Sequence, residues 1–269
     1  MDYLVQGNKA YCYTGGKAYN LTQPTAVFIH GAQNDHSVWG LQTRYFAHHG
    51  YNVLAVDLPG HGRTTGPALT SIEAISAWLL ALLDAAGVER AFLIGHSMGS
   101  LAALETAGAA PARVGKLALV GTAYPMRVSD TLLDAARGDE ARAIDMVNIW
   151  SHSTMSPKPS SPGPGFNVMG GSRRLMQRIA ARGPERLFHT DFSVCNSYSG
   201  GEAAAARVSC PTLLLLGQRD MMTPPKAARM VREAILHARS IEIAGAGHSL
   251  MAEQPDAVLD ALYGFAKEL

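Results

Sequence analysis

The sequence predicts an α/β fold with a mostly parallel central sheet, and three observations support this prediction. Short apolar runs alternate along the chain with helical patterns, as expected when helices connect parallel strands. Several of the runs are continuously apolar, which is typical of strands that are covered by helices on both faces. The length of 269 residues and the hydrophobic content of 47% suit one large domain and exclude a disordered chain.

Six apolar runs are expected to form strands, because each is short and ends at or near glycine or the Asp57–Gly60 segment. They cover residues 26–29, 53–56, 91–94, 117–120, 212–216 and 241–243. The segment before Pro24 has Gly15 and Gly16 between short runs and is expected to form an N-terminal hairpin.

Helical windows lie between these strands and carry recognisable start and stop residues. Ser71 is an N-cap candidate for a helix over 71–86, and Gly87 follows its end. A helix rich in small residues is expected over 98–110, before Pro111. Two further helices, over 224–237 and 255–267, have proline near the first turn, where the missing N–H costs nothing.

The interval from Gly121 to Pro211 is longer than a single connection requires. It spans about 90 residues, whereas a crossover helix between parallel strands needs about 30. Helical windows within it cover 129–136, 139–150 and 172–182, and a loop rich in Pro, Ser and Gly covers 156–165. We interpret the insertion as a helical cap over a site, with an irregular decoration as the alternative. The expected organisation is core 1–123, cap 124–200 and core 201–269.

Composition excludes several classes of function. The 23 basic and 22 acidic residues nearly cancel, so the chain offers no basic field for nucleic acid. We expect no membrane span, since no apolar stretch reaches about 18 residues, and no signal peptide at the N-terminus. Three unpatterned cysteines do not form a disulfide framework, which favours a reducing, cytoplasmic location.

The sharpest motif is Gly95-His96-Ser97-Met98-Gly99, which has the form G-x-S-x-G. It lies directly after an expected strand and before an expected helix, the context that a nucleophile elbow requires. Such a sharp turn lifts the serine hydroxyl clear of the backbone, and the flanking glycines allow close backbone approach. We therefore expect Ser97 to be a catalytic nucleophile.

A serine hydroxyl needs a base to take its proton, and the base needs a carboxylate to orient it. His248 lies in a Gly-rich loop after the last expected strand and is the candidate base. Asp220 follows the strand over 212–216 and is the candidate acid, with helix capping or pairing with Arg219 as the alternative. Two backbone N–H groups, of Ala32 and Met98, are the expected oxyanion hole.

With these residues in order, the chain resembles the α/β-hydrolase superfamily over essentially its whole length. His30-Gly31 and the Asp57–Thr64 segment fit the resemblance as well, and the order Ser, Asp, His is that of the superfamily. The nearest type is the capped subgroup of small esterases, lactonases and carbon–carbon bond hydrolases. The resemblance implies a helical cap and no cofactor, and the serine argues against branches that use a carboxylate nucleophile.

Other polar residues are expected to serve structure or the pocket. Structural roles are expected for Asp57, His61 and His96, and no metal-ligand spacing is present. Three residues of the insertion are expected to contact substrate, with simple packing of the cap as the alternative. They are Tyr124, Met146 and Trp150.

The sequence therefore predicts a serine hydrolase that uses water to cleave a carboxylic ester or lactone of a small, uncharged or weakly charged molecule. One alternative is a carbon–carbon bond hydrolase of ring-cleavage products, which needs a pocket arginine such as Arg173 or Arg174. Another is a ligand receptor that keeps the triad and turns over slowly. We expect no nucleic-acid or membrane partner, and the sequence leaves monomer and homodimer open.

Overall fold

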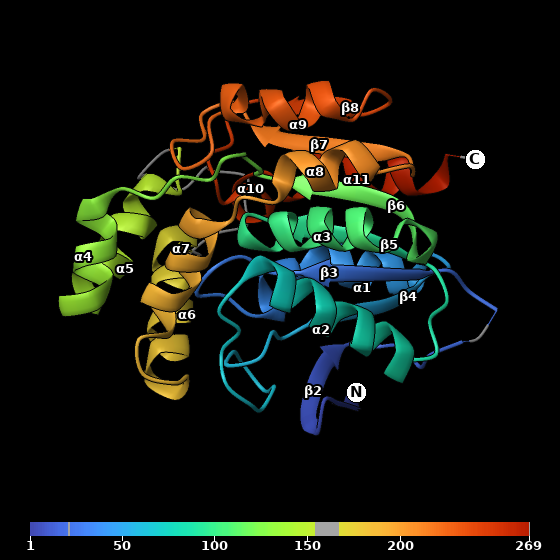
Figure 1. Cartoon of the computed structure of the whole chain (residues 1–269), viewed down its shortest axis with the longest axis horizontal. Coiled ribbons are helices and arrows are strands. Elements are labelled where there is room, and N and C mark those ends of the chain that lie inside the picture. Colours follow the sequence, from blue (N-terminus) through green and yellow to red (C-terminus); the bar gives the residue numbers. More distant parts are fainter. Residues whose placement is uncertain (21, 154–166, 269) are drawn as a thin grey trace.

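The computed structural model describes residues 1–20, 22–153 and 167–268. Within these residues the chain forms an eight-stranded sheet with the order β1-β2-β4-β3-β5-β6-β7-β8 (Figure 1). Strands β3 to β8 are parallel, and β1 and β2 form the predicted N-terminal hairpin, which joins the sheet through β4. The predicted α/β fold is confirmed.

The expected strands are all present, most of them longer by a few residues. The strands are β1 (Asp2–Val5), β2 (Asn8–Tyr13), β3 (Thr25–Ile29), β4 (Asn52–Val56), β5 (Ala91–His96), β6 (Val114–Val120), β7 (Thr212–Gly217) and β8 (Arg239–Ile243). Every residue of β3, β4, β5 and β7 is buried, as their continuously apolar sequences predict.

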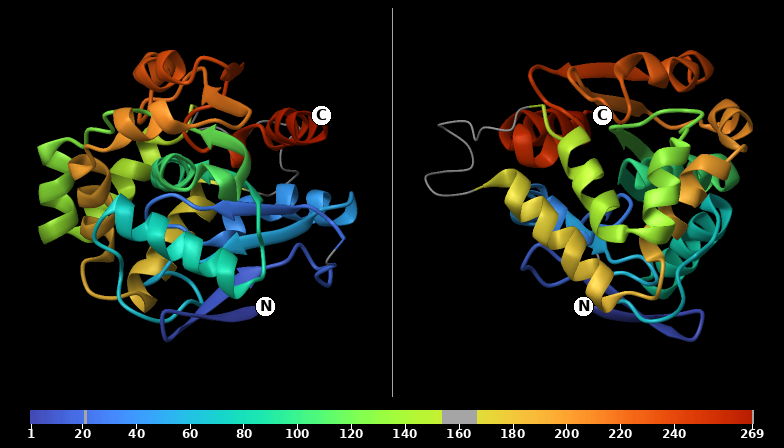
Figure 2. Two further views of the ribbon diagram at one scale, coloured as in Figure 1. Left: turned by 45° about the vertical axis from the view of Figure 1, so that its right-hand side comes forward. Right: turned by 90° about the vertical axis from the view of Figure 1, so that its left-hand side faces the viewer.

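Helices cover both faces of the sheet (Figures 1 and 2). One face carries α2 (Ile72–Ala85), α3 (Met98–Ala109), α8 (Gly201–Arg207) and α9 (Arg229–Ala234); the other carries α1 (Gly40–His48), α10 (Leu250–Glu253) and α11 (Pro255–Lys267). Short 3₁₀ turns span His36–Trp39, Pro111–Arg113 and Pro225–Ala228.

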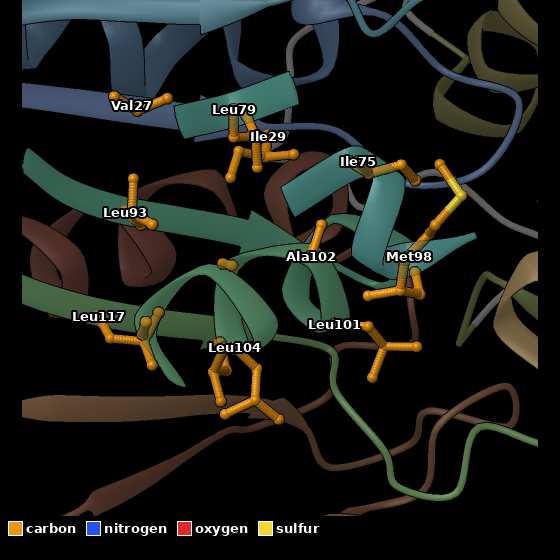
Figure 3. Close-up of a cluster of buried hydrophobic side chains, with 14 of the residues drawn as sticks. Val27, Ile29, Ile75, Leu79, Leu93, Met98, Leu101, Ala102, Leu104 and Leu117 are labelled. Carbon is orange, nitrogen blue, oxygen red and sulfur yellow. The ribbon is translucent and has the colours of Figure 1, made fainter. Parts of the chain in front are cut away.

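The apolar core lies between the sheet and these helices. Leu101 and Leu104 of α3 belong to the same buried cluster as Leu93 of β5 and Leu117 of β6, and Figure 3 shows Leu104 beside Leu117. All four side chains are fully buried. Burial of one such side chain contributes roughly 1.5–3 kcal/mol. This packing fixes α3, and with it the turn that precedes the helix.

The insertion between β6 and β7 folds as a helical cap. It contains α4 (Asp130–Gly138), α5 (Glu140–Trp150), α6 (Val168–Arg182) and α7 (Leu187–Ser197), which lie together at the left of Figure 1. A separate apolar cluster, which includes Leu132, Ile144, Met176 and Phe188, holds these helices together. The predicted loop over 156–165 lies outside the described residues, and the domain boundaries at 123/124 and 200/201 stay predictions.

The structure differs from the sequence-based expectation in two places. The expected helix over 224–237 is divided into the 3₁₀ turn Pro225–Ala228 and the short α9. Helices α7, α8 and α10 (Leu250–Glu253) were not predicted. Within the described residues, no helix is long and apolar enough to span a bilayer.

Candidate active site

Ser97 lies in a strained turn between β5 and α3. Its φ of 52° and ψ of −120° are unusual for a residue with a side chain, so the surroundings must hold it there. A Cβ atom on Gly95 would lie 2.1 Å from the carbonyl oxygen of Gly99, and one on Gly99 would lie 2.5 Å from that of His30. Both positions therefore require glycine, as the G-x-S-x-G pattern predicts.

His248 and Asp220 are brought together from the carboxyl ends of neighbouring strands. Nδ1 of His248 donates to Oδ2 of Asp220 at 2.8 Å, and both residues are buried. The same oxygen accepts the Thr223 hydroxyl at 2.7 Å, and that hydroxyl lies 3.1 Å from Nδ1 of His248. With its proton on Nδ1, a neutral His248 keeps a lone pair on Nε2 for a base role.

The surroundings keep Asp220 ionised. Burial alone would raise the pKa of Asp220, but His248 and the hydrogen bonds from His248 and Thr223 lower it to about 2. Its Oδ1 also accepts the backbone N–H groups of Met222 and Thr223, each at 2.8 Å. The carboxylate is thus available to orient an imidazole throughout the neutral range.

Ser97 and His248 line the same two cavities. In the part of the chain that the structure describes, the Ser97 hydroxyl makes no hydrogen bond to His248. Catalytic hydrogen bonds are often long in unliganded enzymes and shorten when substrate binds. The two side chains therefore line one shared space, in which we expect this hydrogen bond to form.

A buried carboxylate holds the loop of His248. Oε2 of Glu253 accepts the N–H of Gly247 at 2.6 Å, and its Oε1 accepts the backbone N–H and the hydroxyl of Ser153. The N–H of Ser249 donates to the carbonyl of Ser151 at 2.9 Å. Both neighbours of His248 are therefore fixed against the chain segment that follows α5.

The two expected oxyanion donors are the backbone N–H groups of Ala32 and Met98. Ala32 follows β3 and lines both cavities, and Met98 is the first residue of α3. Among the described residues, neither backbone N–H has a hydrogen-bond partner. These N–H groups are thus free to receive a developing negative charge, and Met98 adds the positive end of its helix dipole.

Residues 26–261 match the model of the alpha/beta hydrolase family. The chain belongs to this family. A non-heme chloroperoxidase of Streptomyces lividans is 30% identical over 256 residues, which are 90% of this chain and 91% of the relative. A putative carbamate hydrolase of Klebsiella pneumoniae is 26% identical over 84% of this chain and 85% of its own.

Solved structures agree with the fold of this alpha/beta hydrolase. The enol-lactonase from Burkholderia xenovorans LB400 superimposes with a TM-score of 0.82 over 100% of both chains, at 22% identity. At that identity the likeness shows the shared fold, so the chemistry has to be argued from the site itself.

Of the two cavities at Ser97 in this alpha/beta hydrolase, the larger has a volume of about 320 Å³ and is mainly apolar. Its apolar walls include Met126, Val128, Leu132, Trp150, Phe192 and Met222. Trp150 was predicted to contact substrate, whereas Phe192 and Met222 were not. The N–H of Met222 donates to Asp220. The position of Met222, two residues after the candidate acid, was the sequence signal that could have indicated Met222 as a pocket residue.

The smaller cavity, about 160 Å³, is lined by several polar side chains. They include Asn34, Ser37, Ser151, Ser172 and Ser249. Since Ala32, Ser97, Phe192, Met222 and His248 line both cavities, the two spaces meet at the candidate nucleophile.

The structure places two expected pocket residues elsewhere. Tyr124 packs edge-on against Tyr198, with ring centroids 5.7 Å apart, and lines a separate groove with Lys226. Met146 packs onto the apolar cluster of the cap. Neither residue lines the two cavities at Ser97, because each side chain is turned toward a neighbouring element.

One cluster has the residue types of a metal site, namely Asp35, His36 and Asp57. Its acceptor atoms already have N–H partners. Arg178 donates to Asp35 at 2.8 Å, and Asp57 accepts Nδ1 of His36 and the backbone N–H of Arg63. This donor set does not fit a cation, so we assign the cluster a structural role, as expected for Asp57.

Proposed function

We propose that this alpha/beta hydrolase is a serine hydrolase that cleaves a carboxylic ester or lactone of a small organic molecule. The observation that carries the proposal is the Asp220–His248 hydrogen bond beside Ser97 in its strained turn, where the two cavities meet. A nucleophile, a base and an orienting acid in this order are the components of acyl transfer.

In the proposed mechanism, Ser97 Oγ attacks the carbonyl carbon while Nε2 of His248 takes the hydroxyl proton. The tetrahedral oxyanion accepts hydrogen bonds from the N–H groups of Ala32 and Met98. Collapse of the intermediate breaks the ester bond, and His248 gives the proton to the leaving alcohol. Water, activated by His248, then releases the acid and restores Ser97.

The two cavities indicate the shape of the substrate. The apolar space of about 320 Å³ suits a hydrocarbon portion. The smaller space of about 160 Å³, whose mainly apolar wall also carries hydroxyl and amide side chains, suits a compact portion with hydrogen-bonding groups. A relative named as a putative carbamate hydrolase supports an acyl-type substrate. The proposed reaction needs water and no cofactor.

One structural observation bears on the alternative of a carbon–carbon bond hydrolase: an arginine, Arg127, lines the larger cavity at Ser97, but it is not one of the two arginines expected from the sequence. Arg173 is engaged with Asp145 on the cap surface at 2.5 Å, and neither Arg173 nor Arg174 lines the cavities at Ser97. A cytoplasmic location also belongs to the proposal. It is supported by the three cysteines, which are buried free thiols.

The test is turnover of p-nitrophenyl esters, lactones and dienoates by the wild type and Ser97→Ala. The proposal expects repeated turnover of esters or lactones, and a loss of several orders of magnitude in the folded variant. Preference for dienoates would favour carbon–carbon cleavage, and a single slow burst would favour the receptor. An unchanged rate in Ser97→Ala would exclude Ser97 as the nucleophile.

A further inference from the structure

A buried carboxylate of the cap contacts the loop that carries the proposed oxyanion donor Ala32. Asp191 lies on α7, and its Oδ2 accepts the backbone N–H of Gln33 at 2.7 Å. The same oxygen accepts Nε2–H of His61 at 2.9 Å. The side chains of His61 and Asp191 are only 2% and 4% exposed, so water does not substitute for these contacts.

Gln33 is held in a conformation that it does not prefer. Its φ of 53° lies in the left-handed region, and the residue is fully buried. Its side-chain Nε2 donates to the carbonyl of Met176 on α6 at 3.2 Å. Two cap helices therefore bind one core residue, one through its backbone and the other through its side chain.

Gln33 directly follows the proposed oxyanion donor Ala32, so the contact with Asp191 affects the backbone of Ala32. The N–H that Asp191 accepts belongs to the peptide joining Ala32 to Gln33, so the hydrogen bond restrains the backbone of Ala32. An oxyanion donor must be aimed at the place where charge develops, and a misplacement of about 1 Å can cost about 100-fold in rate.

We propose that Asp191 is a positioning residue through which the docked cap sets the direction of the Ala32 N–H. The inference rests on the proposed function, because it assigns the cap a part in forming the oxyanion hole. His61 supports this role as the partner of the carboxylate. Its Nδ1–H donates to the Pro59 carbonyl at 3.1 Å, and its Nε2–H donates to Asp191. Because both ring nitrogens donate, the imidazole is protonated and its positive charge faces the negative charge of Asp191.

Three variants separate positioning from folding. Asp191→Ala removes both hydrogen bonds. Asp191→Asn can keep both, because an amide oxygen in the place of Oδ2 accepts the Gln33 N–H and the Nε2–H of a neutral His61. Asp145→Asn is the matched control, since Asp145 is another cap carboxylate, is 46% exposed and pairs with Arg173 on the surface.

Asp191→Ala is expected to lose about 100-fold in kcat with little change in KM. Its affinity for a trifluoromethyl ketone, whose adduct with Ser97 carries an oxyanion, should fall by a similar factor. Asp191→Asn should recover most of both, and Asp145→Asn should match the wild type. Should Asp191→Ala not fold, Asp191→Leu keeps the volume and is expected to show the same loss.

Hydrogen exchange of the peptide that contains Gln33 tests the contact without reference to activity. Asp191→Ala should exchange faster there, and Asp191→Asn should not. Unchanged kcat, ketone affinity and exchange in folded Asp191→Ala would overturn the inference while leaving the proposed function standing. If the wild type does not turn over esters or lactones, the proposed function fails. Faster exchange would then support the contact alone, and the role in catalysis would be overturned.

Discussion

The imidazole of His96 donates its Nε2–H to the backbone carbonyl of His248 at 2.9 Å. The two rings lie 4.7 Å apart, and His96 is buried beside the candidate nucleophile. Burial and the nearby His248 lower the pKa of His96 to about 3. A permanently neutral His96 thus holds the loop of His248, which agrees with the structural role expected from the sequence.

His96→Phe keeps a ring in this place and removes the donor. We expect a loss of about 1–3 kcal/mol in the free energy of unfolding, because the carbonyl of His248 becomes unsatisfied. Esterase activity should fall with it, because the loop of His248 is loosened. Urea unfolding measures the stability, and His48→Phe on the exposed end of α1 is the control. Equal stability of His96→Phe and wild type would contradict the structural role.

Asp220→Asn is expected to reduce kcat by about 10⁴-fold with little effect on the fold, because the amide favours the wrong tautomer of His248. Thr223→Val removes one hydrogen bond to Asp220 and leaves the Asp220–His248 bond, so its loss should be much smaller. Steady-state kinetics on a p-nitrophenyl ester compare the two. A smaller loss in Asp220→Asn than in Thr223→Val would argue against Asp220 as the acid.

Gly95→Ala should disrupt the turn at Ser97, because the added Cβ meets the Gly99 carbonyl at 2.1 Å. We expect a loss of several kcal/mol in stability, or no folded protein, since backbone must move. Gly264→Ala in α11 is the control, with nothing within 4 Å of the added atom, and should gain about 1 kcal/mol. Thermal unfolding of both variants distinguishes the steric clash of the added Cβ at position 95 from a general effect of replacing glycine by alanine.

The His61–Asp191 pair predicts a dependence of stability on pH. Burial opposes a charge on His61, but Asp191, the Pro59 carbonyl and Asp57 raise its pKa above the ordinary value. The stabilisation should therefore be fully present below the unfolded pKa of about 6.5 and lost as pH rises through the higher folded pKa.

Asp191→Asn leaves His61 neutral, so it should lack this alkaline loss. Chemical unfolding of both proteins from pH 6 upward measures the difference in free energy, which is expected to shrink with rising pH. A difference that does not change with pH would show that His61 is neutral in the folded protein.

Local patterns predicted the parts of the site that local sterics decide. The turn at Ser97 follows from Gly95 and Gly99, which the backbone requires. Strand ends positioned Asp220 and His248, because parallel strands present their carboxyl ends at one edge of the sheet. Short contiguous stretches of sequence determine the turn and the strand ends, so both can be predicted without knowledge of the tertiary structure.

The cap was predicted less well, because its contacts join distant residues. Helix α7 contains Thr, Asp, Ser and Asn, whose helix propensities are poor, and tertiary packing stabilises it instead. Periodicity does not tell which face of a cap helix meets the cavity, so Met146 was assigned to the pocket although it packs within the cap. The role proposed for Asp191 needs Gln33, which is 158 positions away.

The bond from Gln33 to Asp191 also limits how freely the substrate preference of this enzyme can be redesigned. The proposed nucleophile, base and acid all belong to the core, whereas Leu132, Trp150 and Phe192 of the inserted helices form much of the apolar cavity wall. Replacing the inserted helices by those of another family member would change that wall. It would also remove Asp191, the acceptor for the backbone N–H of Gln33. A working chimera therefore has to carry an equivalent carboxylate or amide, together with a partner for His61.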